Sequence, residues 1–333
     1  MLPDLQSDPF GERSVLLRKA VRLLGANFRF DSNSAELMRL VDWAYKGLPR
    51  HRLPGPGHEL RVSLRLTPDA HRRRPAEPPP IAMLSGSGLL GGAAAGSNLV
   101  TVAPHENASL VAVSSDMLRY PYHARYELLE FAVFTLAARA QRLVSLHAAC
   151  VGHRGSGLIL IGPTGAGKST VALHCLLDGM DFLSEDSTFV SPATMLATGV
   201  SNFVHIRADS LGWLGGSREA AAIRRSPVIQ RRSGVRKFEL DLRAGSFRLA
   251  KAPLKIVGVV LLSPQSAGDQ SLLRPISRAA LLANFADSQA YGASQPQWGE
   301  FSRNVSRLGL FELRRGNHPC EAVQALRSVL EKR

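Results

Sequence analysis

The feature that most constrains the fold is a glycine-rich loop between an apolar run and a helical pattern. The phosphate-loop pattern G-x-x-x-x-G-K-[ST] is filled by Gly162, Gly167, Lys168 and Ser169. The apolar run "LILI" precedes the loop, and "KSTVALHCLLDG" follows it as a helix closed by Gly179. In such a strand–loop–helix unit, backbone N–H groups point inward and the helix N-terminus adds positive potential. The sequence therefore predicts a nucleotide-binding loop in an α/β domain.

Each polar group of this loop has an expected partner on a bound nucleotide. Lys168 is expected to reach the β- and γ-phosphates, and Ser169 is expected to hold Mg²⁺. A glycine-rich turn that binds no ligand is the alternative. The residues assigned to nucleotide binding are Gly162, Thr164, Gly165, Ala166, Gly167, Lys168, Ser169 and Thr170.

Two adjacent acids follow the loop at the end of a predicted strand. Glu185 and Asp186 lie 17 and 18 residues after Lys168, behind the apolar start "MDFL". Adjacent residues of a strand point to opposite faces, so we expect the two acids to have different roles. One would bind Mg²⁺, and the other would accept the proton of an attacking hydroxyl as general base. The local sequence leaves open whether that hydroxyl belongs to a substrate or to water.

Length and composition indicate a two-domain protein of the cytoplasm. The chain has 333 residues, of which 45% are hydrophobic, and its three cysteines lack metal-site spacing. Cys150, Cys175 and Cys320 are therefore expected to be reduced thiols packed in the core. The N-terminus does not resemble a secretory signal, and the chain has no run of about 18 apolar residues. These features predict a soluble protein without a membrane span.

The net charge of +14 raises the question of nucleic-acid binding. Long Lys/Arg clusters are missing, and the only dense groups are "HRRRP" (71–75) and "IRRSPVIQRRSGVRK" (223–237). Basic charge scattered over a solvated surface is the favoured interpretation, and nucleic acid is not an expected partner. The second dense group would suit an acidic substrate or nucleotide phosphates, with a solvated loop as the equal alternative. Its basic residues are Arg224, Arg225, Arg231, Arg232, Arg236 and Lys237.

Periodicity predicts two domains with a boundary near residue 145. Residues 1–145 form a mixed α+β domain with strands at "NFRFD", "HELRVSLRLTP" and "ASLVAVSS". A helix capped by Ser34 and a long helix from about Tyr122 to Leu143 complete it. Residues 70–83 are expected to be a loop, and residues 86–100 a turn between strands or a flap. Residues 146–333 form the α/β domain with the glycine-rich loop, and "CEAVQALRSVLEK" is its closing amphipathic helix.

The segment "LHAACV…GLILIGPTGAGKSTVALHCLLDGMDFLSED" resembles the HPr kinase/phosphorylase family, especially the HPr-kinase-like peptide kinases. That family has a His that opens a strand, the phosphate loop, a helix ending in Gly, and a pair of acids. His147, Lys168, Gly179 and the Glu185–Asp186 pair match these features in register over about forty residues. Looser similarity extends through "FELRRGNHPCEAVQALRSVL".

The resemblance implies a P-loop kinase fold akin to ATP-dependent phosphoenolpyruvate carboxykinase. It implies ATP and Mg²⁺ as cofactors, and transfer of the γ-phosphoryl group to a serine of a protein or a ribosomally made, lasso-type precursor peptide. Carried across, Lys168 contacts the phosphates, and Ser169 and Asp186 hold the metal. Glu185 and Asp186 take the paired-acid role, with His147 beside the site.

Two positions depart from the family pattern. Glu185 stands where the first of two aspartates is usual, which leaves open which acid is the base. In "HIRADSLGWLG", Arg207 matches the later family signature E-I-R-G-L-G, but His205 stands in place of its Glu. The phosphorylase reaction is therefore not predicted. The N-terminal half does not match the usual partner domain, so HPr itself is not the expected substrate.

Other functions remain open from the sequence. A small-molecule kinase would share the nucleotide site and differ in the acceptor pocket. A P-loop ATPase or switch module without a phosphoacceptor is a further alternative, although the signatures L-S-G-G-Q and N-K-x-D are missing from the sequence. The oligomeric state, a homo-oligomer included, is open as well.

Overall fold

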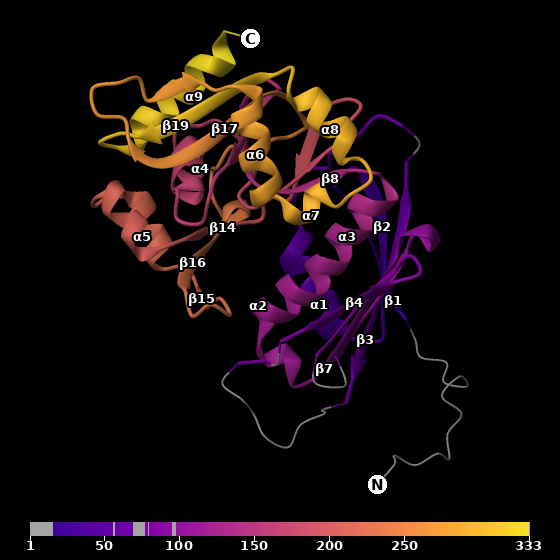
Figure 1. Cartoon of the computed structure of the whole chain (residues 1–333). Helices are drawn as coiled ribbons and strands as arrows, with labels where there is room; N and C mark the ends of the chain where they lie inside the picture. The colour runs from indigo at the N-terminus through magenta and orange to yellow at the C-terminus, as the bar shows by residue number, and fades with distance from the viewer. Residues whose placement is uncertain (1–15, 56, 69–76, 79, 95–97, 333) are drawn as a thin grey trace, which may run out of the picture. The chain divides into compact units, whose positions relative to one another are not determined.

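The computed structural model describes residues 16–55, 57–68, 77–78, 80–94 and 98–332, and Figure 1 labels its elements. Its contacts divide the chain into two units. The first contains the chain up to Val21, Asn27–Lys46 and Glu59–Leu136, and the second contains Arg22–Ala26, Gly47–His58 and everything from Ala137 onward. The predicted domain limits, 1–145 and 146–333, stay predictions, because contacts within one chain do not show which part folds alone.

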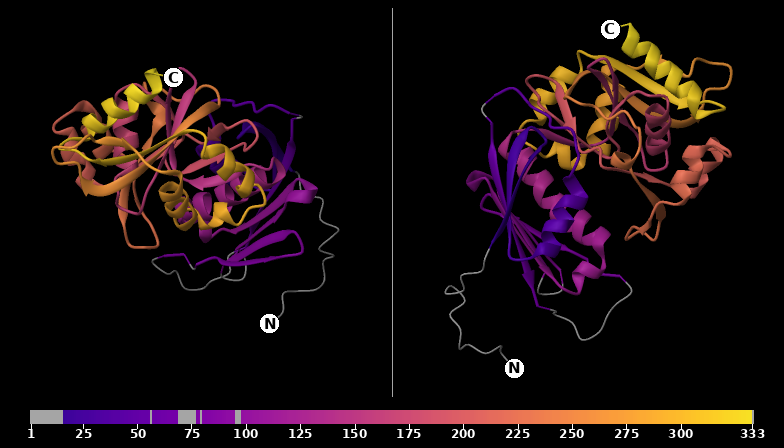
Figure 2. Two further views of the ribbon diagram at one scale, coloured as in Figure 1. Left: turned by 45° about the horizontal axis from the view of Figure 1, so that its top comes forward. Right: turned by 180° about the vertical axis from the view of Figure 1, so that it is seen from behind.

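The first unit is built on a seven-stranded sheet with the order β1-β2-β3-β7-β6-β5-β4. On β3, Leu60, Val62 and Leu64 are buried, and they alternate with more exposed residues. Alternation with period two buries one face of a sheet, and helices cover that face here (Figures 1 and 2). The strands are β1 (Leu17–Leu23), β2 (Ala26–Ser32), β3 (Glu59–Thr67), β4 (Ala82–Gly86), β5 (Leu89–Ala94), β6 (Asn98–Ala103) and β7 (Ala108–Ser114).

The helices of this part follow the predicted pattern with one difference. Ser34 caps α1 (Ala35–Tyr45), because its side chain accepts from the N–H groups of Glu36 and Leu37. The predicted long helix consists of α2 (Pro121–His123), a π-helical segment (Ala124–Glu130) and α3 (Phe131–Ala140). The apolar period does not distinguish a π turn from an α turn, so the interruption is not visible in the sequence.

The small-residue segment at 86–100 was expected to be a turn or flap, and most of it is strand. β4 and β5 form a hairpin whose turn residues Ser87 and Gly88 both have positive φ, 49° and 77°. Such a turn matches the twist of the two strands it joins. Residues 95–97, and most of the predicted loop at 70–83 with its "HRRRP" cluster, lie outside the described residues.

The second unit is a mixed α/β structure around a nine-stranded sheet. The central strand β10 pairs in parallel with β17 and antiparallel with β9. Leu158 and Leu160 of β10 belong to one core, and Ile159 and Ile161 belong to another. The first core includes residues of α4 and α9, and the second includes residues of α6 and α8. Because both faces are covered, β10 is apolar at all four positions of Leu158–Ile161.

The bounds of these elements are as follows. The large sheet contains β8 (Val144–His147), β9 (Ala149–His153), β10 (Ser156–Ile161), β11 (Asp181–Ser184), β12 (Ser187–Val190), β13 (Leu196–Gly199), β17 (Leu254–Ser266), β18 (Leu273–Pro275) and β19 (Gly309–Arg315). A small sheet contains β14 (Phe203–Ile206), β16 (Arg236–Asp241) and β15 (Val228–Gln230). The helices are α4 (Lys168–Leu177), α5 (Arg218–Arg224), α6 (Arg278–Ser288), α7 (Ala290–Ala293), α8 (Trp298–Val305) and α9 (Pro319–Glu331). Short 3₁₀ helices lie at Pro104–Glu106, Met117–Arg119, Ala208–Leu214 and Leu242–Ala244.

An N-terminal segment forms part of the second unit through His51. Its imidazole is buried, with Nδ1 2.8 Å from Thr198 Oγ1 and Nε2 2.8 Å from the carbonyl oxygen of Ala250. Burial lowers the pKa of His51. As a neutral side chain, His51 therefore satisfies the hydrogen-bonding groups of two residues inside the unit.

The cysteines are free thiols, but only two of them lie in the core. Cys150 and Cys175 are buried, and burial raises the pKa of both thiols. Cys320 is exposed, contrary to the expectation of core packing, because it lies in the first turn of α9. Within the described ranges, no helix combines the length and the apolar character needed to cross a membrane.

Candidate active site

The glycine-rich loop joins β10 to α4, as the sequence pattern predicts. Gly165 and Gly167 have φ values of +81° and +101°, and a Cβ at either position would meet nothing within 4 Å. Glycine is therefore required there by the backbone conformation, since side chains other than hydrogen disfavour positive φ. At Gly162 space matters as well, because a Cβ would lie 2.8 Å from the carbonyl oxygen of Leu262.

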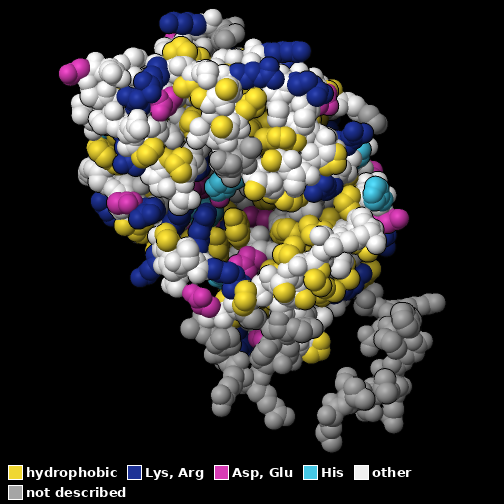
Figure 3. Space-filling model, viewed as in Figure 1, with side chains coloured by type: hydrophobic (Ala, Val, Ile, Leu, Met, Phe, Trp, Pro, Cys, Tyr) yellow, Lys and Arg dark blue, Asp and Glu magenta, His cyan; other side chains and the backbone are white. Residues whose placement is uncertain are grey.

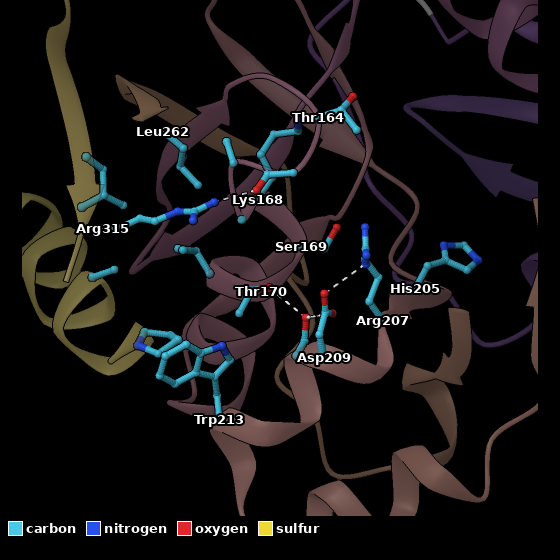
Figure 4. Close-up of a pocket in the computed structure, with 18 of the residues that line it drawn as sticks. Thr164, Lys168, Ser169, Thr170, His205, Arg207, Asp209, Trp213, Leu262 and Arg315 are labelled. Atoms are coloured by element: carbon cyan, nitrogen blue, oxygen red, sulfur yellow. Dashed lines mark hydrogen bonds and ion pairs between the residues drawn. The ribbon is translucent and has the colours of Figure 1, made fainter. Parts of the chain in front are cut away.

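Two cationic side chains lie against this loop. Lys168 Nζ donates to the carbonyl oxygen of Gly162 at 2.7 Å. Arg315 Nη2 donates to the carbonyl oxygen of Gly165 at 2.9 Å. Arg315 reaches the loop from the end of β19 (Figure 4). Burial lowers the pKa of Lys168, while the nearby charge of Asp186 acts in the opposite direction. Positive charge is thus concentrated at the N-terminus of α4.

Strand register brings His147 and Asp186 together. β8 and β12 pair antiparallel, with His147 opposite Ser187, and the N–H of Ala148 donates to the carbonyl oxygen of Asp186. The side chains consequently meet, with His147 Nδ1 2.9 Å from Asp186 Oδ1. An Nη2 of Arg231 lies 3.6 Å from the other carboxylate oxygen.

Asp186 is held ionised by these neighbours. Burial alone would raise its pKa, but the hydrogen bond and charge of His147, followed by the charges of Arg231 and Lys237, lower it. The carboxylate is partly exposed and lines the same cavity as residues 164–170 of the loop and helix. It can therefore act as a proton acceptor or a metal ligand in that cavity.

Glu185 lies in a different environment, although it is the next residue in the chain. Its side chain is only 5% exposed, and it does not belong to the cavity lining. One carboxylate oxygen accepts from the backbone N–H of His205 at 2.8 Å and lies 3.1 Å from its Nδ1. The two acids form a bend between β11 and β12 rather than the end of a strand, and their side chains still reach different surroundings, as predicted.

His205 links Glu185 to a second buried acid. β14 and β16 pair with His205 opposite Glu239, and His205 Nε2 lies 2.9 Å from a Glu239 oxygen. Ionised carboxylates only accept hydrogen bonds, so both ring nitrogens donate and the ring is an imidazolium. Burial alone would lower the pKa of His205, but the two carboxylates raise it to about 9. In turn, His205 lowers the pKa of Glu185 against the effect of burial.

The backbone of His147 is held by a residue far away in the sequence. The side-chain oxygen of Gln289 accepts from the N–H of His147 at 2.7 Å, and its amide nitrogen donates to the carbonyl oxygen of His147 at 3.0 Å. Gln289 is buried between α6 and α7. Both backbone groups of His147 are thus fixed by one side chain, which positions the imidazole that contacts Asp186.

These groups surround a cavity of about 1020 Å³. Of the residues predicted for the site, His147, Asp186 and all of 164–170 line it, whereas Gly162 and Glu185 do not. In Figure 4, Arg207 and His205 lie on one side of Thr170 and Trp213 lies on the other. The charged side chains of the lining are Lys168, Arg207, Arg231, Lys237, Arg314, Arg315, Asp186 and Asp209.

The predicted basic cluster at 223–237 divides into two sets. Arg231 and Lys237 line the cavity, whereas Arg224, Arg225, Arg232 and Arg236 are exposed. Burial lowers the pKa of Lys237, and the charge of Glu185 opposes this effect. On the face of the molecule in Figure 3, Lys and Arg side chains are interspersed with other types.

The oxygen atoms of the cavity are suited to Mg²⁺ only in combination with phosphate. Ser169 and Asp186 both line the cavity and are hard oxygen ligands. No group of three or more His, Cys, Asp or Glu residues that could hold a metal occurs among the described residues. Magnesium commonly binds through one or two protein ligands, substrate phosphates and water, and this donor set fits that mode.

Several residues of the site carry no local sequence signal. Gln289, Glu239 and Arg315 reach it from separate elements, and His205 stood out only as a departure from the family pattern. A search for acids or bases near the glycine-rich loop in the sequence would not find them. Their contribution depends on strand register and on contacts between distant segments.

Comparisons with known proteins found no match in sequence, but they found a similarity to a solved structure. No protein-family model matches the chain, and no curated protein matches it. A solved structure of the Hpr(Ser) kinase/phosphatase from Coxiella burnetii is similar over 56% of this chain and 97% of its own, at 10% identity and a TM-score of 0.29. A similarity at this level does not establish a shared fold, so the proposals below rest on the residues of the site.

Proposed function

We propose that this protein is an ATP-dependent phosphotransferase that transfers the γ-phosphoryl group to a serine hydroxyl of a protein or peptide. The observation that carries the proposal is the position of Asp186, which contacts His147 and lines the same cavity as the glycine-rich loop. A binding site for the phosphoryl donor and a proton acceptor would thereby share one cavity. The local resemblance to HPr-kinase-like peptide kinases supports the same reaction.

The donor side follows from the loop. Backbone N–H groups at the start of α4 and the ammonium group of Lys168 would bind the β- and γ-phosphates. Arg315 supports the backbone of the loop through its hydrogen bond to the carbonyl oxygen of Gly165. Ser169 would hold Mg²⁺ together with phosphate oxygens, and Asp186 would contact the ion through water, so that its carboxylate stays available to accept a proton. Bound Mg²⁺ supplies neutralisation of the charge that develops on the transferred group.

Of the two acids, Asp186 is the better candidate for the general base. The acceptor hydroxyl would give its proton to the Asp186 carboxylate while its oxygen bonds to the γ-phosphorus and the bond to the ADP oxygen breaks. His147 orients this carboxylate and stabilises its ionised form. Glu185 is occupied by His205 and is assigned a positioning role, since it fixes β14 behind the cavity.

The acceptor side carries more positive charge than one triphosphate group requires. Arg207, Arg231 and Lys237 line this side together with Asp186. Cationic side chains in a confined site favour anionic groups through electrostatic complementarity. We therefore propose a peptide or protein acceptor that carries acidic groups near the serine.

Transfer to peptides tests the proposal directly. The full-length protein is incubated with Mg²⁺, γ-labelled ATP and serine peptides with acidic or neutral flanks, and label is followed in peptide and in free phosphate. We expect label in the acidic peptides, no label in their Ser→Ala counterparts, and no turnover by the Lys168→Ala variant. Label found only as free phosphate with every peptide would contradict the kinase assignment and favour an ATPase.

A further inference from the structure

The cavity has an aromatic end that the phosphate-transfer groups do not use. Trp213 lies on the 3₁₀ helix Ala208–Leu214, lines the cavity, and leaves 46% of its surface exposed. Among the large hydrophobic side chains exposed in the described part of the chain, it is the one that lines this cavity. Val171, Pro319 and Ala322 line the cavity as well and are apolar. An exposed indole in a concave site is a common feature of ligand recognition.

Trp213 is fixed in place from two directions. Ser210, on the same 3₁₀ helix, lies 3.1 Å through its hydroxyl from that of Thr170, which ties this helix to the first turn of α4. His318 caps α9 and places its ring against the indole, with centroids 5.5 Å apart and planes at 86°. The position of the indole is therefore set before any ligand binds.

The hydrogen bonds of His318 define its tautomer. Its Nδ1 accepts from the backbone N–H of Cys320 at 3.2 Å, and its Nε2 lies 3.2 Å from the carbonyl oxygen of Trp213. A carbonyl only accepts, so Nε2 carries the hydrogen and Nδ1 does not. The imidazole thus joins the cap of α9 to the backbone of Trp213, and its ring packs against the indole.

We propose that Trp213 is the stacking platform for the purine base of the nucleoside triphosphate. This inference rests on the proposed nucleotide site, because the phosphates define the start of the ligand. One cavity carries Lys168 and Arg315 at the glycine-rich loop and the indole beside the first turn of α4 (Figure 4). That arrangement offers cations to the phosphates and an aromatic surface to the base, and the two-ring purine gains more from stacking than a pyrimidine.

Nucleotide binding measured by calorimetry tests the platform. The full-length protein and its Trp213→Ala variant are titrated with ATP, CTP and inorganic tripolyphosphate in the presence of Mg²⁺. We expect Trp213→Ala to weaken ATP binding about 10- to 100-fold, from the usual contribution of one base–aromatic stack. Tripolyphosphate should bind both proteins equally, and CTP should bind the unaltered protein more weakly than ATP does.

Two further variants control for indirect effects. Trp213→Phe keeps an aromatic face and should retain most of the ATP affinity, while Val228→Ala removes exposed apolar surface outside the cavity and should change nothing. If ATP and tripolyphosphate bind the unaltered protein equally and Trp213→Ala changes neither, the platform is wrong but the phosphate site stands. If neither ligand binds the unaltered protein, the proposed function and the platform both fail.

Discussion

Glu185 and Asp186 are adjacent in the chain but lie in opposite surroundings. Asp186 contacts His147 and reaches the cavity, whereas Glu185 is buried against the imidazolium of His205 and does not reach it. Both carboxylates have lowered pKa values, but His205 lowers the pKa of Glu185, whereas His147 and Arg231 lower that of Asp186. A lowered pKa therefore does not by itself identify the catalytic acid, since exposure to the substrate decides which carboxylate can react.

The sharpest test of this comparison exchanges each carboxylate for its amide. We expect Asp186→Asn to reduce kcat about 100- to 10,000-fold, because it removes the proton acceptor. The unfolding midpoint in urea should fall less than it does in Glu185→Gln, since this carboxylate is partly exposed and Glu185 is buried. Glu185→Gln should do the reverse, lowering the urea midpoint while the folded enzyme keeps most of its rate. A loss of rate in Glu185→Gln equal to that in Asp186→Asn would contradict the assignment.

The buried cluster should depend strongly on its central cation. His205→Asn removes the cation that contacts both buried carboxylates, Glu185 and Glu239, and we expect a loss of about 3–5 kcal/mol in the free energy of unfolding. Equilibrium denaturation measures this loss. The double variant His205→Asn/Glu239→Gln serves as the control, because it also removes one of the two carboxylate charges that His205 contacts. Stability no better in the double variant than in His205→Asn would show that charge is not the cause.

The same cluster predicts a pH dependence on the alkaline side. The pKa of His205 is raised from 6.5 to about 9, so its contribution to stability is complete below about 6.5 and is lost as the pH rises through about 9. The lowered pKa of Glu185 adds stability that is lost only as the pH falls into the acid range. Urea midpoints between pH 6 and pH 10 should therefore decline in the unaltered protein. The decline should be shallower in His205→Asn, and equal slopes would exclude His205 as the titrating group.

The smallest expected effect concerns the support of His147. Gln289→Ala removes two hydrogen bonds to the backbone of His147 but leaves the contacts of Asp186 with other residues in place. We expect kcat to fall about 10- to 100-fold, as when the partners that orient ligating residues are removed, with KM for ATP unchanged. Gln289→Glu keeps the acceptor for the N–H and should recover part of the rate. A change confined to KM would place Gln289 outside the catalytic arrangement.

Much of the fold could be predicted from local patterns. The apolar run before the glycine-rich loop, the helix after it, the cap at Ser34 and the alternation in β3 each depend on neighbours within a few residues. Alternation also predicted that Glu185 and Asp186 differ. It could not predict which acid faces the cavity, because that depends on the pairing of β8 with β12 and of β14 with β16.

The remaining site residues depend on contacts between distant segments. Gln289 lies 142 residues from His147, and Glu239 lies 34 residues from His205. A glutamine between two helices and a glutamate in a strand are common in any sequence, so the residue types of Gln289 and Glu239 did not indicate a role in the site. Trp213 lies in the segment "HIRADSLGWLG", but its role was not predicted, because the cap of α9 that contacts it lies 105 residues later.

His51 bears on how this protein can be divided. A chain beginning at residue 146 would contain every residue proposed for catalysis, yet Thr198 and the carbonyl of Ala250 would lose the imidazole that serves both. Unsatisfied polar groups in a core are costly, so such a fragment would start with a defect. We therefore expect the half of the chain that carries the proposed chemistry to be less stable when it is expressed without the segment around His51. A recombination or gene fusion that moved it without the stretch around His51 would transfer the active-site residues but not the whole scaffold beneath them.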